Sequence, residues 1–296
     1  MQKTSPLSHF LKMSNPLALL GGALFYALGV GIEFYLHGTV DWAHYWLGQA
    51  CVTLLQLTSF YLKAVYDQPV NSAGAKNNHG EERLLHNTIL LAAYSTLAVG
   101  TAFIILLVIS KAISPAGYLI LGIAFLLVLV YAVPPLRLVY SGYGELLQAF
   151  LVASLIPALG FILQSGSYHR LLAMLAFPLL ALYLALLLVF SLPNYGEDMR
   201  LERRTLMVRI GWQNGMNLHN FLILGGYLLL GIAAVLGLPW SITWKGLLSL
   251  PVGLFQIWQM WQISNGAKPH WNLLRITAIS SLALTAYFLT FALWAG

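Results

Sequence analysis

The chain has 296 residues, of which 59% are hydrophobic and only 8% are charged. A soluble domain carries about 25% charged residues, so most of this surface must face lipid. The single cysteine, Cys51, excludes an internal disulfide. The formal net charge of +6 indicates basic membrane loops rather than a nucleic-acid surface.

Nine apolar runs follow one another along the chain, and most are close to the roughly 20 residues that a membrane-spanning helix needs. The polar N-terminal stretch precedes a run that is too long for a signal-peptide core, so we interpret that run as the first span. The sequence therefore predicts an all-α polytopic membrane bundle of about nine helices in a single domain, 1–296. The predicted spans are 17–37, 43–66, 87–110, 116–134, 145–164, 171–192, 216–238, 246–263 and 272–295.

The basic residues are distributed unevenly between the two sides of this predicted bundle. Twelve of the fifteen lysines and arginines fall on the side of the N-terminus, and three fall on the other. By the positive-inside rule we expect a cytoplasmic N-terminus and an external C-terminus, in an inner (cytoplasmic) membrane if the source is bacterial. Three polar segments, 63–86, 135–145 and 193–213, share the cytoplasmic side, which predicts one site there.

The segment 193–211 is the richest in functional groups. Asn194, Asp198 and Glu202 are spaced by four residues and would share one face of a helix. Stacked carboxylates suit Mg²⁺, and the arginines that follow suit a diphosphate. A basic loop that only fixes topology is the alternative interpretation of this segment.

This segment resembles the second aspartate motif of the UbiA superfamily of intramembrane prenyltransferases. It is most similar to the branch that prenylates 1,4-dihydroxy-2-naphthoate for menaquinone, P-D-Y-x-x-D-x-x-x-G-K-R-T-L-x-V-R-x-G. Asn194 replaces the first aspartate, Glu202 the glycine and Arg203 the lysine. The matching residues are Pro193, Tyr195, Asp198, Arg204, Thr205, Leu206, Val208, Arg209 and Gly211.

Two further segments resemble the same family. The segment 131–145 is similar to Y-x-x-P-P-L-R-L-K-x-x-G-x-G-E, with Arg137 at its centre. The segment 59–71 falls where the family has N-D-x-x-D-x-x-x-D, but only one acid remains. By the spacing of that motif, Lys63 stands at the asparagine, Ala64 at the adjoining aspartate, Asp67 at the middle aspartate and Asn71 at the last aspartate.

The resemblance implies transfer of a polyprenyl group from a prenyl diphosphate to an aromatic, quinone-precursor-like acceptor, inside a central cavity of the bundle. It implies catalytic roles for Asp67, Asp198 and Tyr131. The implied ligands of Mg²⁺ are Asp67, Asn71, Asn194 and Asp198, in a weakened site that Glu202, Glu197 or Glu145 could supplement. The implied diphosphate-binding residues are Lys63, Arg137, Arg203 and Arg204.

The departures in the first motif leave a second interpretation open. A catalytically degenerate subunit with this fold would bind an isoprenoid, a quinone or a pigment in a membrane protein complex. A transporter or channel is disfavoured, because polar residues are scarce inside the predicted spans.

Overall fold

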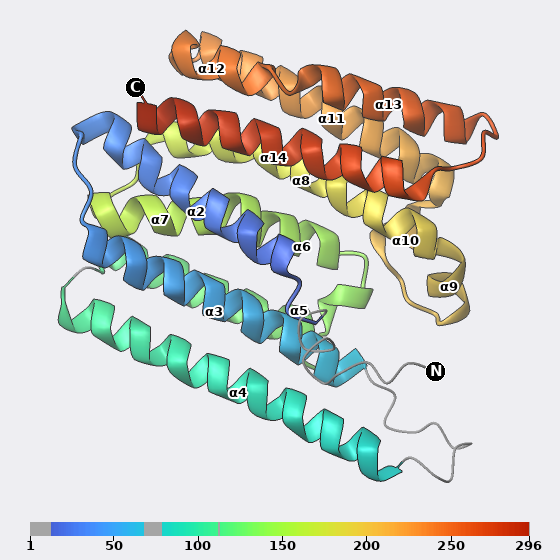
Figure 1. Ribbon diagram of the computed structural model, residues 1–296, viewed down its shortest axis with the longest axis horizontal. Coiled ribbons are helices and arrows are strands. Elements are labelled where there is room, and N and C mark those ends of the chain that lie inside the picture. The colour runs from blue at the N-terminus through green and yellow to red at the C-terminus, as the bar shows by residue number, and fades with distance from the viewer. Residues whose placement is uncertain (1–12, 68–78, 112, 296) are drawn as a thin grey trace.

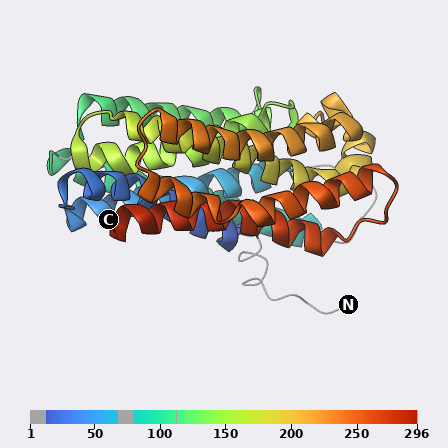
Figure 2. The same cartoon turned by 90° about the horizontal axis from the view of Figure 1, so that it is seen from above.

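The computed structural model describes residues 13–67, 79–111 and 113–295, which form helices and connecting segments with no strand among them. Figures 1 and 2 show long helices lying side by side in an elongated bundle. The long helices are α2 (Pro16–His37), α3 (Trp42–Asp67), α4 (His79–Ile109), α5 (Pro115–Ala132), α8 (Arg170–Ser191), α11 (Trp212–Val235) and α14 (Trp271–Ala295). Shorter helices connect them or continue them: η1 (Leu138–Tyr140), α6 (Gly144–Phe150), η2 (Leu151–Leu155), α7 (Ile156–Ser165), η3 (Leu192–Asn194), α9 (Tyr195–Arg200), α10 (Leu206–Ile210), α12 (Trp240–Leu247) and α13 (Leu250–Ser264).

Seven helical segments among the described residues are long and apolar enough to cross a membrane. They correspond to seven of the predicted spans and support an integral membrane protein. The two other predicted spans are also helical. The span 43–66 is α3, a continuous helix of 26 residues that does not meet the same criteria. A total of nine crossings therefore stays a prediction.

The predicted span 246–263 is interrupted near its start. The chain is helical from Trp240 to Leu247 and again from Leu250 to Ser264, with a break at Leu248 and Ser249. Pro251 explains the break, because a proline has no N–H to continue the preceding helix and is favoured in the first turn of a new one. The Ser249 hydroxyl donates to the Gly246 carbonyl at 2.8 Å and stabilises the end of α12.

Small residues allow the closest helix packing in the bundle. A side chain on Gly29 of α2 would collide with the backbone of Pro157 in α7, and one on Gly160 would collide with the carbonyl of Tyr26. Because both glycines lack a side chain, α2 and α7 approach at backbone distance. This contact contributes to a large apolar core that α2, α5, α7 and α8 share.

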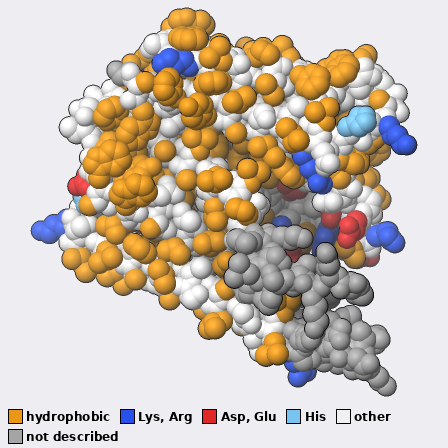
Figure 3. Space-filling model, in the orientation of Figure 1, with side chains coloured by type: hydrophobic (Ala, Val, Ile, Leu, Met, Phe, Trp, Pro, Cys, Tyr) orange, Lys and Arg blue, Asp and Glu red, His pale blue; other side chains and the backbone are white. Residues whose placement is uncertain are grey.

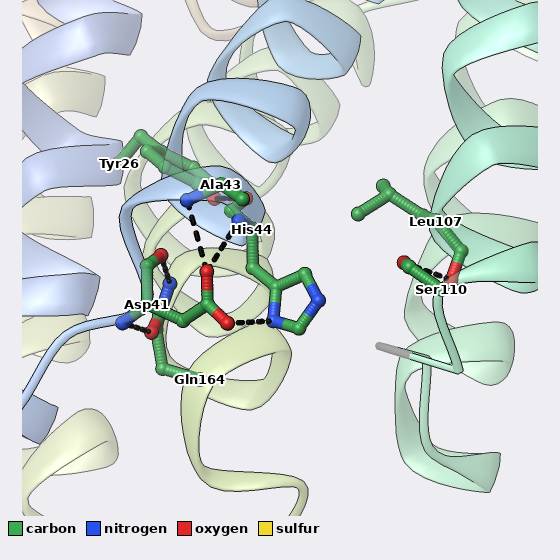
Figure 4. A network of polar contacts seen from close by, with 7 residues as sticks. All are labelled: Tyr26, Asp41, Ala43, His44, Leu107, Ser110 and Gln164. Carbon is green, nitrogen blue, oxygen red and sulfur yellow. Dashed lines mark hydrogen bonds and ion pairs between the residues drawn. The ribbon is translucent and has the colours of Figure 1, made fainter.

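The loop between α2 and α3 is held at the end of the bundle opposite α9 (Figures 1 and 4). Asp41 accepts hydrogen bonds from the backbone N–H groups of Ala43 and His44, so it caps the first turn of α3. Gln164 of α7 bonds both the N–H and the carbonyl of Asp41. These contacts join the α2–α3 loop to α7 and fix the start of α3.

Candidate functional site

The end of α3 is joined to the segment after α5 by an ion pair. The guanidinium of Arg137 lies 2.6 Å from Oδ1 of Asp67, the last residue of α3, and 2.6 Å from the carbonyl oxygen of Tyr66. Both charged side chains are about a quarter to a third exposed. Two of the three segments predicted to meet therefore do meet.

The local backbone places Arg137 by ending α5 abruptly. Pro134 and Pro135 follow the helix and cannot donate to it, so the chain leaves α5 in an extended conformation at Val133. Arg137 itself has a φ of 38°, in the left-handed region. A residue with a β-carbon adopts this conformation at a cost of about 1–2 kcal/mol, and strain of this kind is concentrated at functional sites.

Tyr140 links the ion pair to the third predicted segment. The Arg137 guanidinium lies 4.9 Å from the centre of the Tyr140 ring, and that of Arg203 lies 4.7 Å from it. Burial and a hydrogen bond to Asp67 raise the pKa of the Tyr140 phenol above its ordinary value. The neutral phenol therefore donates to the Asp67 carboxylate, and its ring is a shared cation–π partner for two arginines.

Gly142 allows the segments to pack closely. It has a φ of 81°, and a side chain there would collide with Cδ of Arg209 and press on the carbonyl of Arg204. The backbone N–H of Arg204 also donates to the carbonyl of Tyr140 at 3.1 Å. The segment 135–145 thus lies directly on 203–209.

Asp198 completes this chain of contacts from α9. Its carboxylate is buried, lies 3.6 Å from the Arg203 guanidinium and accepts a hydrogen bond from the Thr205 hydroxyl at 3.5 Å. Asp67, Arg137, Tyr140, Arg203 and Asp198 therefore form one connected cluster, here called the polar cluster. Tyr140 lies within the segment 131–145, but the sequence analysis did not identify it as a site residue.

The prediction that Asn194, Asp198 and Glu202 share one helical face is wrong. The helix α9 ends at Arg200, and Glu202 adopts a left-handed φ of 54°. The Arg203 N–H then donates to the Asp198 carbonyl at 2.8 Å, so the chain turns back on itself. As a result Asp198 is buried, whereas Asn194 and Glu202 are exposed.

Glu145 is the second buried carboxylate in this region. One of its oxygens accepts from the N–H of Leu206 at 3.1 Å and from the Ser191 hydroxyl at 3.5 Å, which caps α10. Its other oxygen, Oε2, is buried without a hydrogen-bond partner among the described residues, and so is Nε of Arg137. Unsatisfied buried groups are rare in folded proteins and call for an explanation.

The remaining predicted residues contribute less to the polar cluster. Lys63 is half-buried on α3, one turn before Asp67, and forms no ion pair among the described residues. The Arg204 side chain is exposed, and Glu197 is exposed on α9. Asn71 lies outside the described residues.

Tyr131 lies between the polar cluster and an apolar cavity. Its ring packs with Leu62 and Val139, and its hydroxyl donates to Oε1 of Gln148 at 3.2 Å. Tyr131 also lines a cavity of about 70 Å³ between α3, α5, α7 and α8, whose other walls are mainly Leu, Ile and Val. A second cavity of about 420 Å³ between α2, α8 and α14 shares Ala18, Gln148 and Tyr183 with the first.

A space-filling view shows where these groups lie on the molecule. In Figure 3 the surface is largely hydrophobic, whereas Lys, Arg, Asp and Glu side chains gather in a hollowed region near the end where α9 and α10 lie in Figure 1. Charged groups at one end of the bundle, next to an apolar interior, can bind a molecule with a charged head and an apolar tail.

A metal site of three or more His, Cys, Asp or Glu side chains is not present among the described residues. Oxygen ligands are nevertheless available near the polar cluster, because two buried carboxylates are bound to adjacent residues: Asp198 accepts from the Thr205 hydroxyl, and Glu145 accepts from the N–H of Leu206. Mg²⁺ is often held in proteins by one or two carboxylates together with substrate phosphates. The residues present fit that mode of binding.

Comparison with known proteins shows the fold of the chain. The structure resembles a UbiA homologue from Archaeoglobus fulgidus bound to Cd²⁺, with a TM-score of 0.63 and 18% identity over 95% of this chain and 98% of the other. It resembles the same homologue bound to GPP and Mg²⁺ with a TM-score of 0.61 and 18% identity, over 97% and 99% of the two chains. A digeranylgeranylglyceryl phosphate synthase gives a TM-score of 0.57 and 16% identity over 97% and 98%.

No family model and no curated protein matches the chain by sequence. At the identities found, the structural likeness shows that the chain has the all-helical membrane fold of UbiA homologues, as the three sequence segments predicted. The similarity to the menaquinone branch stays a prediction.

Proposed function

We propose that the protein is a membrane prenyltransferase that transfers a polyprenyl group from a prenyl diphosphate to an aromatic acceptor. The observation that carries the proposal is the polar cluster, which brings two arginines and two carboxylates together beside Tyr131 and its apolar cavity. The same fold binds GPP and Mg²⁺ in a UbiA homologue.

The arginines of the polar cluster would bind the diphosphate. The guanidinium groups of Arg137 and Arg203 lie 4.9 Å and 4.7 Å from the centre of the Tyr140 ring and pair with different carboxylates, so two positive charges are held near each other. Arginine forks match the geometry of phosphate oxygens, and Arg137 retains a buried Nε with no partner among the described residues. Arg204 and Lys63 are the further cations that could reach the head group.

The carboxylates would bind Mg²⁺ together with the diphosphate. Asp67 and Asp198 would be the principal ligands, and Asn194 and Asn71 the neutral ones of the two motifs. Oε2 of Glu145, which has no hydrogen-bond partner among the described residues, would replace a lost aspartate. When it is bound, Mg²⁺ supplies positive charge that stabilises the departing diphosphate.

The reaction breaks the allylic C1–O bond of the prenyl diphosphate, and both electrons leave with the diphosphate. An aromatic carbon of the acceptor then forms the new C–C bond at C1, and the ring restores its aromaticity by losing a proton to the released diphosphate. Arg137 and Arg203 stabilise the charge that grows on the leaving group, while the apolar walls keep water from the allylic centre. Tyr131, between the two regions, would face this centre with its aromatic ring.

The acceptor and the membrane orientation belong to the same proposal. The Arg-Thr-Leu-x-Val-Arg pattern at 204–209 favours a 1,4-dihydroxy-2-naphthoate-like acceptor, and a quinone precursor of this size would enter from the polar end. The polar end faces the cytoplasm and receives the charged head of the prenyl diphosphate, and the prenyl tail occupies the apolar interior.

The direct test is an assay of the full-length protein in lipid nanodiscs. Labelled farnesyl or geranylgeranyl diphosphate is incubated with 1,4-dihydroxy-2-naphthoate and Mg²⁺, and products are measured by mass spectrometry. We expect a prenylated naphthol, and an Arg203→Gln variant should lose about 10- to 100-fold in kcat/KM. Arg200→Gln is the matched control, because Arg200 is exposed on α9 and forms no ion pair among the described residues.

One observation favours a second candidate, a subunit that binds an isoprenoid or quinone without catalysis. Both aspartates of the polar cluster already have arginine partners, and three of the family's acidic positions carry Ala64, Asn71 and Asn194. This candidate predicts tight binding of a prenyl diphosphate or quinone with no product from any quinol precursor. Product formation by the wild type in the assay above would exclude it.

A further inference from the structure

The helix α13 carries polar side chains where a membrane helix is expected to be apolar. Gln256, Gln259 and Gln262 recur at every third residue and share one face. Trp258 and Trp261 on the same helix are 52% and 54% exposed. Polar side chains turned into a membrane bundle are costly and indicate a functional site by default.

The inner two glutamines contact the neighbouring helices. Gln256 is fully buried and its amide lies 3.0 Å from Nε2 of His219 in α11. Gln259 is 8% exposed, and its Oε1 accepts from the Thr277 hydroxyl of α14 at 3.1 Å. The Nε2 of Gln259 is buried and has no hydrogen-bond partner among the described residues. A buried N–H donor therefore lacks an acceptor at this position.

Gln259 also lines a cavity of about 480 Å³ between the end of α13 and the start of α14. Gln262, Lys268 and His270 contribute the other polar groups of its lining, and Trp258, Ile263 and Leu273 contribute apolar surface. The described lining contains no Asp or Glu, so its charge is positive and its polar groups are mainly donors. The cavity shares no lining residue with the two cavities near Tyr131.

We propose that this cavity binds one anionic glycerophospholipid. Its phosphate would lie between Lys268 and His270, and an ester carbonyl would accept from the unpaired amide N–H of Gln259. One acyl chain would follow Trp258 and Leu273 toward the bilayer. Basic pockets between membrane helices at the cytoplasmic surface suit anionic head groups in this way.

The same groups disfavour two other phosphate-bearing ligands. Free phosphate would use only Lys268 and His270, and would leave the buried N–H of Gln259 without an acceptor and the apolar walls uncovered. A prenyl diphosphate has a charged head and a chain but no ester carbonyl between them. The phospholipid matches all three features of the cavity, and its binding is independent of the proposed transferase activity.

The test measures thermal unfolding of delipidated, full-length protein in detergent as lipid is titrated. We expect phosphatidylglycerol to raise Tm saturably and phosphatidylcholine to raise it far less. Any change in Tm caused by inorganic phosphate or geranylgeranyl diphosphate should be the same in the wild type and in Lys268→Gln. Lys268→Gln and Gln259→Met should each weaken the apparent Kd for phosphatidylglycerol about five- to tenfold. Lys245→Gln is the control, because Lys245 is a basic residue on α12 that is not in the cavity lining.

Three outcomes would overturn the proposal. The first is unchanged phosphatidylglycerol affinity in both cavity variants, and the second is an equal loss in Lys245→Gln, which would indicate general charge attraction. The third is a phosphate-induced shift that matches the lipid-induced one and disappears with Lys268→Gln, which would indicate a phosphate site. If Gln259→Met does not fold, Lys268→Gln, whose side chain is exposed, still decides the result.

Discussion

Arg137 and Asp67 are 70 residues apart in the chain, yet the guanidinium lies 2.6 Å from the carboxylate. The same guanidinium also bonds the Tyr66 carbonyl, so one side chain joins the end of α3 to the segment after α5 by two contacts. The Tyr140 ring lies beside both Arg137 and Arg203, so it links this ion pair to the rest of the polar cluster.

The two contacts of Arg137 predict different effects for two substitutions. Arg137→Lys keeps the charge but cannot bond Asp67 and the Tyr66 carbonyl with one planar fork, so KM for prenyl diphosphate should rise about tenfold. Arg137→Gln removes the charge as well and should lower kcat/KM about 100-fold. Steady-state kinetics of both variants check this, and equal activities for the two would contradict the role of charge.

The pair of Arg203 and Asp198 is expected to contribute to stability as well as to binding. The Asp198 side chain is 9% exposed and that of Arg203 is 32% exposed, so their coupling should be about 1 kcal/mol. A double-mutant cycle of Arg203→Gln and Asp198→Asn, measured by SDS-induced unfolding, reports this value. Additive effects would mean that the 3.6 Å approach has no energetic consequence.

The lost acids of the two motifs predict weak Mg²⁺ binding. Lys63→Asn, Ala64→Asp and Asn194→Asp together add two carboxylates and remove one cation, so the Mg²⁺ concentration for half-maximal activity should fall at least tenfold. A Mg²⁺ titration of the transferase assay measures this change, and EDTA should abolish the activity of both proteins. A restored variant with unchanged Mg²⁺ dependence would show that these positions do not reach the ion.

Glu145 has two oxygens with separate roles, which two substitutions distinguish. Glu145→Ala removes the acceptor that caps α10 and should destabilise the protein by about 1–2 kcal/mol. Glu145→Gln keeps that acceptor but removes the negative charge, so it should raise the Mg²⁺ requirement with a smaller effect on unfolding. If both variants lower stability equally and leave the Mg²⁺ titration unchanged, Glu145 only supports α10.

Tyr140 predicts a pH-dependent contribution to stability. Because burial and the bond to Asp67 raise its pKa in the folded state, its stabilisation is complete below the unfolded pKa of about 10 and is lost as pH rises through the folded value. The difference in Tm between wild type and Tyr140→Phe should therefore be constant from about pH 6 to 9. A difference that shrinks within that window would contradict a neutral, hydrogen-bonded phenol.

Some features of the site could be predicted from single segments. The second aspartate motif and the Pro-Pro segment identified Asp198, Arg203 and Arg137, because each lies in a run of polar residues at the end of a long apolar span. The helical face assumed for Glu202 was wrong, because a regular spacing says nothing about where a helix stops. Tyr140 was missed because an aromatic residue beside a membrane span is usually an interfacial anchor.

The sequence by itself determined that the chain enters the membrane repeatedly and that its charged chemistry gathers at one end. Apolar run length and loop charge are local properties, so they can be read without knowing how the helices pack. Only the tertiary structure decided that Asp67, Arg137, Tyr140, Arg203 and Asp198 are connected. It also showed that Glu145 and Gln259 each have a buried atom with no hydrogen-bond partner in the described part of the chain. Contacts between residues so far apart in the chain depend on how the spans pack. Hydropathy along the chain does not specify which helices are neighbours, so it cannot predict these contacts.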